Sequence, residues 1–171
     1  MPARSAKSAR GSATVPGSAL WRASAQPRRS DALLLDTHAW VWTLDGHQGT
    51  MSVAALALVA AAAATGQLFV SDISFWEVSL KAATGRLALS LDPTLWLTQA
   101  ARAPGIRAIA LTREVLIQST RLPGQPHGDP ADRMLIAQAQ LGGITLLTCD
   151  TAIIEYAAKQ AGIPVCDARA Q

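Results

Sequence analysis

The chain holds four acidic residues in apolar surroundings, far apart along the sequence: Asp36, Glu77, Asp132 and Asp150. Carboxylates that gather at one place repel one another unless a positive charge lies among them. Hard cations such as Mg²⁺ and Mn²⁺ prefer oxygen ligands, and such an ion can activate water and hold a phosphodiester for in-line displacement. If the fold brings these acids together, they indicate metal-dependent cleavage of a phosphodiester bond.

The segment HGDPADRMLIAQAQ, residues 127–140, has the pattern of a helix with an acid in its first turn. Asp129 is a favourable N-cap residue, and Pro130 suits the first helical position. Asp132 follows in the first turn, where the helix dipole favours negative charge, and helical spacing places it near one face with Asp129. We expect Asp129 to act as a cap. We expect Asp132 to bind the metal, and not only to interact favourably with the helix dipole.

Each of the other acids has a structural alternative to metal binding. Asp36 could be a solvated acid at the end of a strand. Glu77 falls in the first turn of a helix expected over 75–84, where it could form a Ser-x-x-Glu capping box with Ser74. Asp150 could cap the helix that follows it. We expect all three acids to bind the metal, and Glu77 can do so while it also takes part in the capping box.

Short apolar runs alternate with helical patterns along the chain. Strands are expected over 32–36, 68–71, 107–111, 144–148 and 163–166. Helices are expected over 37–44, 53–64, 75–84, 92–101, about eight residues after Thr112, from Asp129 to the Gly142-Gly143 pair, and 151–161. This alternation predicts an α/β domain of three layers, in which helices cover both faces of a central parallel sheet of four to five strands.

The expected elements place the four acids at one edge of this sheet. In open α/β sheets the functional crevice lies beyond the carboxyl ends of the strands. Asp36 and Asp150 come at such ends. Glu77 and Asp132 each lie in the first turn of a helix, and a first turn that follows a strand belongs to the same edge. Four carboxylates that are distant in sequence can therefore converge on one crevice.

Composition and charge favour one folded domain behind a basic arm. Half of the 171 residues are hydrophobic, which is enough for a real core. The first thirty residues hold six Arg and Lys and no acid, so residues 31–171 carry nine bases against twelve acids. Net charge therefore gives no argument for a basic nucleic-acid-binding domain. We expect residues 1–30 to form a disordered basic arm and residues 31–171 to form the domain.

The two cysteines, Cys149 and Cys166, lack the spacing of a zinc site and are too few for a disulfide framework. A reducing, cytoplasmic location is therefore expected. No run of about 18 apolar residues is free of polar interruption, so we expect no membrane span.

The chain contains, in this order, the segments LLLDTHAWVW, ISFWEVSLKAATGRL, HGDPADRMLIAQA and LLTCD. In order and spacing these segments resemble the PIN-domain nucleases, above all the VapC-type toxins of bacterial toxin–antitoxin pairs. The resemblance covers about residues 32–167. The chain departs from the family pattern at Ala131, where an aromatic residue is common, and at Cys149, where a basic residue is common.

This resemblance implies a PIN-like fold and Mg²⁺-dependent endonucleolytic cleavage of RNA, with Mn²⁺ as a possible substitute. The family's metal-binding and catalytic acids correspond here to Asp36, Glu77, Asp132 and Asp150. The resemblance also implies an RNA substrate, a homodimer and inhibition by a cognate antitoxin protein.

Two other functions fit parts of the pattern. A phosphohydrolase could use Asp36 as its nucleophile, but that chemistry usually wants a second acid two residues later, where this chain has His38. A non-catalytic PIN-like module could bind RNA or a protein partner, but a binding module has no reason to keep four mutually repelling acids.

Several residues beside the acids have open roles. We expect His38 and His127 to be structural rather than acid–base catalysts. Thr148 could hydrogen-bond a carboxylate or a phosphate, and Arg133 could pair with an acid or meet a phosphate. We expect four tryptophans to belong to the core or to an interface: Trp40, Trp42, Trp76 and Trp96.

Overall fold

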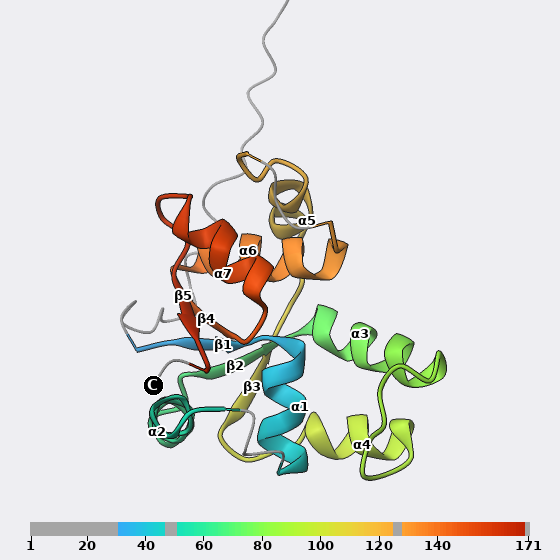
Figure 1. Cartoon of the computed structure of the whole chain (residues 1–171). Helices are drawn as coiled ribbons and strands as arrows, with labels where there is room; N and C mark the ends of the chain where they lie inside the picture. The colour runs from blue at the N-terminus through green and yellow to red at the C-terminus, as the bar shows by residue number, and fades with distance from the viewer. Residues whose placement is uncertain (1–30, 47–50, 125–127, 170–171) are drawn as a thin grey trace, which may run out of the picture.

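A parallel sheet forms the centre of the molecule in the computed structural model, which describes residues 31–46, 51–124 and 128–169. The strands are β1 (Leu33–Leu35), β2 (Leu68–Ser71), β3 (Ile106–Ile109), β4 (Thr145–Thr148) and β5 (Val165–Asp167). They lie in the order β3-β2-β1-β4-β5, and every neighbouring pair is parallel (Figure 1). The expected α/β fold with a parallel sheet of four to five strands is confirmed, with five.

Helices cover both faces of the sheet (Figure 1). They are α1 (Thr37–Asp45), α2 (Val53–Ala64), α3 (Asp72–Ala83), α4 (Pro93–Ala100), α5 (Arg113–Ser119), α6 (Pro130–Gly142) and α7 (Thr151–Ala158). The core on one face takes its helical side chains mainly from α1, α2 and α4, and the core on the other face takes them mainly from α5, α6 and α7. Helix α3 contributes Val78 to the first core and Ile73 to the second, so it lies between the two helical layers.

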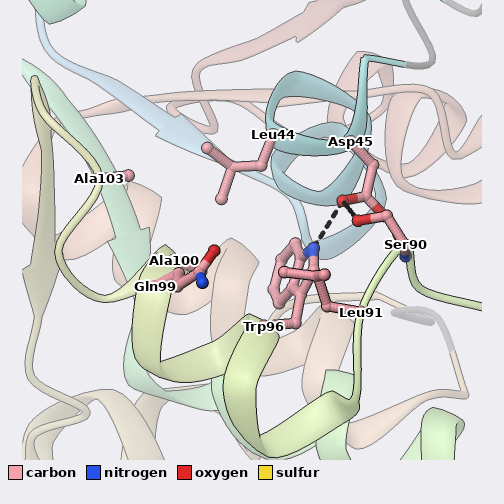
Figure 2. A pocket seen from close by; sticks show the side chains of 8 residues that line it. All are labelled: Leu44, Asp45, Ser90, Leu91, Trp96, Gln99, Ala100 and Ala103. Atoms are coloured by element: carbon pink, nitrogen blue, oxygen red, sulfur yellow. Dashed lines mark hydrogen bonds between the residues drawn. The ribbon is translucent and has the colours of Figure 1, made fainter.

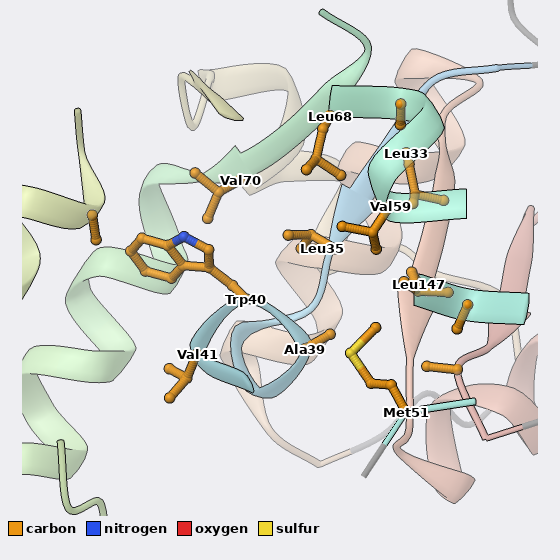
Figure 3. Packing of buried hydrophobic residues seen from close by; sticks show 14 of the residues in the cluster. Leu33, Leu35, Ala39, Trp40, Val41, Met51, Val59, Leu68, Val70 and Leu147 are labelled. Atoms are coloured by element: carbon orange, nitrogen blue, oxygen red, sulfur yellow. The ribbon is translucent and has the colours of Figure 1, made fainter. Parts of the chain in front are cut away.

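The central strand β1 is buried on both faces, as its unbroken leucine run predicts. Leu33 and Leu35 belong to the core that Trp40 fills, and Leu34 belongs to the opposite core. Trp40 lies beside Leu35 (Figure 3), and its ring centroid is 4.7 Å from that of Phe75. This packing fixes the start of α1 against the end of β1, which is where Asp36 lies.

Helix α3 begins three residues before the expected start. Ser71, the last residue of β2, caps the helix by accepting a 3.3 Å hydrogen bond from the amide of Ile73. The chain therefore passes from strand to helix without a loop, and Ser74 is a helical residue. The expected capping box between Ser74 and Glu77 is wrong, because Glu77 lies in the second turn of α3 and not in the first.

The other elements agree with the sequence to within a few residues. The cap expected at Asp129 is confirmed, and Ser52, Asp92 and Thr112 cap their helices in the same way, since each of the four side chains accepts a hydrogen bond from a backbone amide in the first turn. Strand β3 lies slightly earlier than expected, α7 ends three residues sooner, and β5 extends to Asp167.

Two predictions fall outside the described residues, namely the arm over 1–30 and the role of His127. Among the helices that the structure does describe, none combines the length and the apolar character needed to cross a bilayer.

Candidate active site

Asp36 lies directly after β1, at the carboxyl edge of the sheet. It occupies the N-cap position of α1, but its side chain makes no capping hydrogen bond. Instead Oδ2 accepts a 2.7 Å hydrogen bond from the hydroxyl of Thr148, the last residue of the neighbouring strand β4. The side chain is 3% exposed, so the alternative of a solvated strand-end acid is wrong.

The surroundings of Asp36 disfavour its charged form. Burial raises the pKa of this carboxyl, and the negative charge of Glu77 raises it further. The hydrogen bond from Thr148 and the nearby His38 act in the opposite direction, and the net direction is upward. A buried acid of this kind keeps its charge more easily when a cation is bound beside it.

Glu77 is the second buried acid, and it reaches the same region from α3. Its Oε2 accepts a 2.6 Å hydrogen bond from the hydroxyl of Thr37, the residue after Asp36. The same hydroxyl lies 3.0 Å from that of Ser74, one turn earlier on α3. Thr37 therefore fixes α3 to the start of α1, which explains why the charge of Glu77 acts on Asp36.

Lys81 is a member of this group that the sequence analysis missed. Its Nζ lies 2.5 Å from Oε1 of Glu77, one turn along α3, and 3.4 Å from Nε2 of the exposed His38. The spacing of four residues between Glu77 and Lys81 was the available signal. That spacing usually marks a surface pair, and only the structure shows that the carboxylate is buried.

Asp150 approaches the site through Thr148. The backbone amide of Asp150 donates a 2.9 Å hydrogen bond to the Thr148 hydroxyl, which in turn donates to Asp36. The Asp150 side chain caps α7, because Oδ1 accepts hydrogen bonds from the amides of Ala152 at 2.7 Å and Ile153 at 3.1 Å. The capping role considered for Asp150 is therefore confirmed. Since both bonds use one oxygen, capping and cation binding by the other oxygen are compatible.

Asp132 lies in the first turn of α6 and is buried. The start of α6 packs beside α3, since Trp76 of α3 and Ala131 of α6 line one apolar hollow. Asp129 accepts a 2.8 Å hydrogen bond from the amide of Ala131, which confirms it as the cap. The Nε of Arg133 donates a 3.2 Å hydrogen bond to the backbone carbonyl of Ser119, and the two roles expected for Arg133 stay predictions.

A second cation that the sequence analysis missed lies at the end of β5. Arg169 pairs with Asp167, whose Oδ1 is 3.1 Å from its Nε, and its Nη1 donates to the Thr151 hydroxyl at 3.2 Å. The hydrogen bond from Arg169 lowers the pKa of Asp167. The guanidinium of Arg169 also interacts electrostatically with Asp150. Arg169 therefore places positive charge near Cys149, where the family pattern commonly has a basic residue.

A hydrogen-bond cluster at the far end of α1 holds this helix in place (Figure 2). Oδ1 of Asp45 accepts a 2.6 Å hydrogen bond from the indole of Trp96 and a 2.8 Å hydrogen bond from the hydroxyl of Ser90. Oδ2 accepts a further hydrogen bond from the Ser90 amide at 3.2 Å. The cluster ties α1 to α4 and to the segment before α4, and so fixes the helix whose start carries Asp36 and Thr37.

The tryptophan predictions divide between core and surface. Trp40 and Trp96 are buried in the core, as expected, and Trp42 packs against it. Trp76 is 55% exposed. Both cysteines are free and partly buried, and burial raises the pKa of each thiol.

The donor set fits an oxygen-preferring divalent cation, because Asp36 and Glu77 are both buried and act on each other electrostatically. Across residues 31–46, 51–124 and 128–169, however, no three His, Cys, Asp or Glu side chains are grouped closely enough to hold a metal ion. The structure thus brings Asp36 and Glu77 together and links Asp150 to them through Thr148. Convergence of all four acids on one ion stays a prediction.

The family model for the PIN domain matches residues 33–159, a range that includes all four acids. Ribonuclease VapC22 of Mycobacterium tuberculosis is 33% identical over 118 residues, which cover 69% of this chain and 86% of that protein.

Proposed function

Because the chain belongs to the PIN-domain family and is a nuclease of the VapC type, we propose that it cleaves RNA internally as the toxin of a toxin–antitoxin pair, with Mg²⁺ as its cofactor. The observation that carries this proposal is the pair of buried carboxylates, Asp36 and Glu77, at the carboxyl edge of the sheet. Burial and the nearby negative charge of Glu77 raise the pKa of Asp36, and a bound cation would offset that effect.

The residues that would hold the ion are Asp36, Glu77, Asp132 and Asp150, and Mn²⁺ would suit the same oxygen ligands. Bound there, the ion supplies positive charge that activates water for attack on phosphorus and neutralises the phosphoryl oxygens. The chain's own part is to hold the ligands in place. Thr148 orients Asp36, and Thr37 orients Glu77.

The cations beside these acids suit a phosphodiester backbone. Lys81 lies next to Glu77, and Arg169 lies near Asp150. Both flank the acidic group, and both can neutralise phosphates on either side of the scissile bond. A phosphodiester backbone is therefore the substrate that this charge arrangement suits, and the similarity to a ribonuclease supports RNA as its source.

We also propose a homodimer and a cognate antitoxin partner, in a cytoplasmic location. Apolar side chains on the surface of two helices support a protein interface, namely Trp76 and Leu80 of α3 and Leu116 and Ile117 of α5. The two free thiols support a reducing compartment.

The test is cleavage of single-stranded RNA by the purified chain with Mg²⁺, with EDTA, and with the variant Asp36→Asn. Asp31→Asn is the matched control, because it makes the same change at an exposed residue before β1, at the opposite edge of the sheet. We expect cleavage only with Mg²⁺, its loss in Asp36→Asn and its retention in Asp31→Asn. Undiminished cleavage in EDTA, or by Asp36→Asn, would contradict the proposed function.

A further inference from the structure

Lys81 forms an ion pair that differs from an ordinary pair on a helix surface. The side chain of Glu77 is 6% exposed, whereas that of Lys81 is 24% exposed. Burial of a charged group without a partner is costly, and in the structure the ammonium group of Lys81 is the partner of the Glu77 carboxylate. The ammonium group itself can still be reached from solvent.

Both oxygens of Glu77 are already engaged. Oε2 accepts the hydrogen bond from Thr37, and Oε1 pairs with Lys81. A cation that binds Glu77 must therefore share or replace one of these partners. Thr37 is 1% exposed and fixed at the start of α1. Lys81 has a long flexible side chain that reaches solvent, so it is the partner that can leave.

We propose that Lys81 is a functional residue of this site, whose ammonium group takes the place of the divalent cation at Glu77 and turns to a substrate phosphate when the cation binds. Repulsion between the ammonium group and the arriving ion drives the exchange. The Nε2 of the exposed His38 lies 3.4 Å from Nζ, and in the tautomer that leaves Nε2 unprotonated it is a second acceptor within reach of the same ammonium group. The inference rests on the proposed function, because it needs a cation site that includes Glu77.

The test compares Lys81→Met and Lys81→Arg with the wild-type full chain. Lys159→Met is the matched control, since Lys159 is exposed at the end of α7, away from Glu77. The first measurement is thermal unfolding without RNA over a series of Mg²⁺ concentrations. Lys81→Met removes the competing charge, so Mg²⁺ should reach half-saturation at a concentration about three- to tenfold lower than in the wild type. Lys81→Arg and Lys159→Met should respond as the wild type does.

The second measurement is the KM for a short single-stranded RNA at saturating Mg²⁺ and several salt concentrations. Loss of one phosphate contact should raise KM in Lys81→Met and reduce the slope of log KM against log salt by about 0.7. Lys81→Arg should restore both values. A lysine that only supported the fold would give the opposite result for the metal, because its loss would weaken Mg²⁺ binding.

Three outcomes decide the matter. Tighter Mg²⁺ binding together with weaker RNA binding in Lys81→Met supports the exchange. An unchanged or weaker Mg²⁺ response in Lys81→Met, or an unchanged KM, overturns it. If the wild type itself shows no response to Mg²⁺, the proposed cation site is wrong and the inference is wrong with it. If the wild type responds to Mg²⁺ and Lys81→Met responds equally, only the inference is wrong.

Discussion

The hydroxyl of Thr148 donates a 2.7 Å hydrogen bond to the carboxylate of Asp36, although 112 positions separate the two residues. The same hydroxyl accepts the amide hydrogen of Asp150. β1 and β4 are neighbours in the sheet, so one threonine joins the ends of two strands that each lead to an acid. The sheet topology alone therefore determines part of the site.

Thr148→Val should test this link. Valine keeps the shape of threonine but leaves the buried Asp36 carboxylate and the Asp150 amide without their partner. We expect the Mg²⁺-dependent cleavage rate to fall by about 10–100-fold, as is usual when a residue that orients a metal ligand is lost. Thr148→Ser keeps the hydroxyl and should retain most of the rate. Equal rates for wild type and Thr148→Val would show that this hydrogen bond does not position Asp36.

The fold and the acids could be predicted because their signals are local. An unbroken run such as Leu33–Leu35 indicates a buried parallel strand, and an acid after such a run lies at the functional edge of the sheet. The start of α3 could not be predicted in this way. Ser71 and Ser74 are both good caps, and nothing local shows that Ser71 ends a strand and caps the helix at the same time.

The pKa of Asp36 predicts how stability depends on pH when no metal is present. Burial raises this pKa in the folded state above the unfolded value of about 3.9, so the native chain holds its proton more tightly. The contribution of this carboxyl to the free energy of unfolding is fully present below the unfolded pKa. It is lost as the pH rises through the folded pKa. In EDTA, the free energy of unfolding should therefore decrease as pH rises above about 4.

Asp36→Asn isolates this effect from the other titrating groups. Asparagine cannot ionise, and its carbonyl oxygen can still accept the hydrogen bond from Thr148. In EDTA the variant should lose part of the pH dependence and should be more stable than the wild type at neutral pH. Urea unfolding of both proteins at several pH values measures this. A variant that is less stable than the wild type at neutral pH would show that the charged form of Asp36 is not disfavoured.

Asp45 should be important for stability but not for the reaction. Its carboxylate accepts hydrogen bonds from Trp96 and Ser90 and joins α1 to α4. Asp45→Ala should lower the free energy of unfolding by about 1–3 kcal/mol, since three donors lose their acceptor. The cleavage rate should change little at a temperature where the variant is folded. Ser90→Ala should lower the free energy of unfolding by less than Asp45→Ala does. A severe loss of cleavage rate in folded Asp45→Ala would show that Asp45 takes part in the reaction.

Contacts between distant segments explain what the sequence could not show. The spacing of Glu77 and Lys81 is visible in the sequence, but the burial of Glu77 and its hydrogen bond from Thr37, which lies on another helix, are not. Arg169 was missed because β5 was expected to end at Cys166, and one more strand residue, Asp167, brings the guanidinium to the edge of the sheet. Pair spacing is local information, whereas the dielectric surroundings of a pair are set by the tertiary fold.

Asp150 has two roles that can be separated by two substitutions. Its Oδ1 caps α7, and its charge is proposed to help to hold the cation. Asparagine caps a helix about as well as aspartate, so Asp150→Asn should keep the cap and lose only the charge. In EDTA, Asp150→Asn should be about as stable as the wild type, because the asparagine side chain keeps the cap on α7. Asp150→Ala loses the cap as well and should be less stable by about 0.5–2 kcal/mol.

Mg²⁺ distinguishes the second role from the first. An ion that binds only the native state raises the unfolding temperature, and the size of the rise follows its affinity. Both variants should show a smaller rise than the wild type, although only Asp150→Ala has lost the cap. Thermal unfolding of the three proteins with EDTA and with Mg²⁺ gives the comparison. If Asp150→Asn responds to Mg²⁺ as fully as the wild type, Asp150 is a helix cap alone, and the cation is held by the other acids.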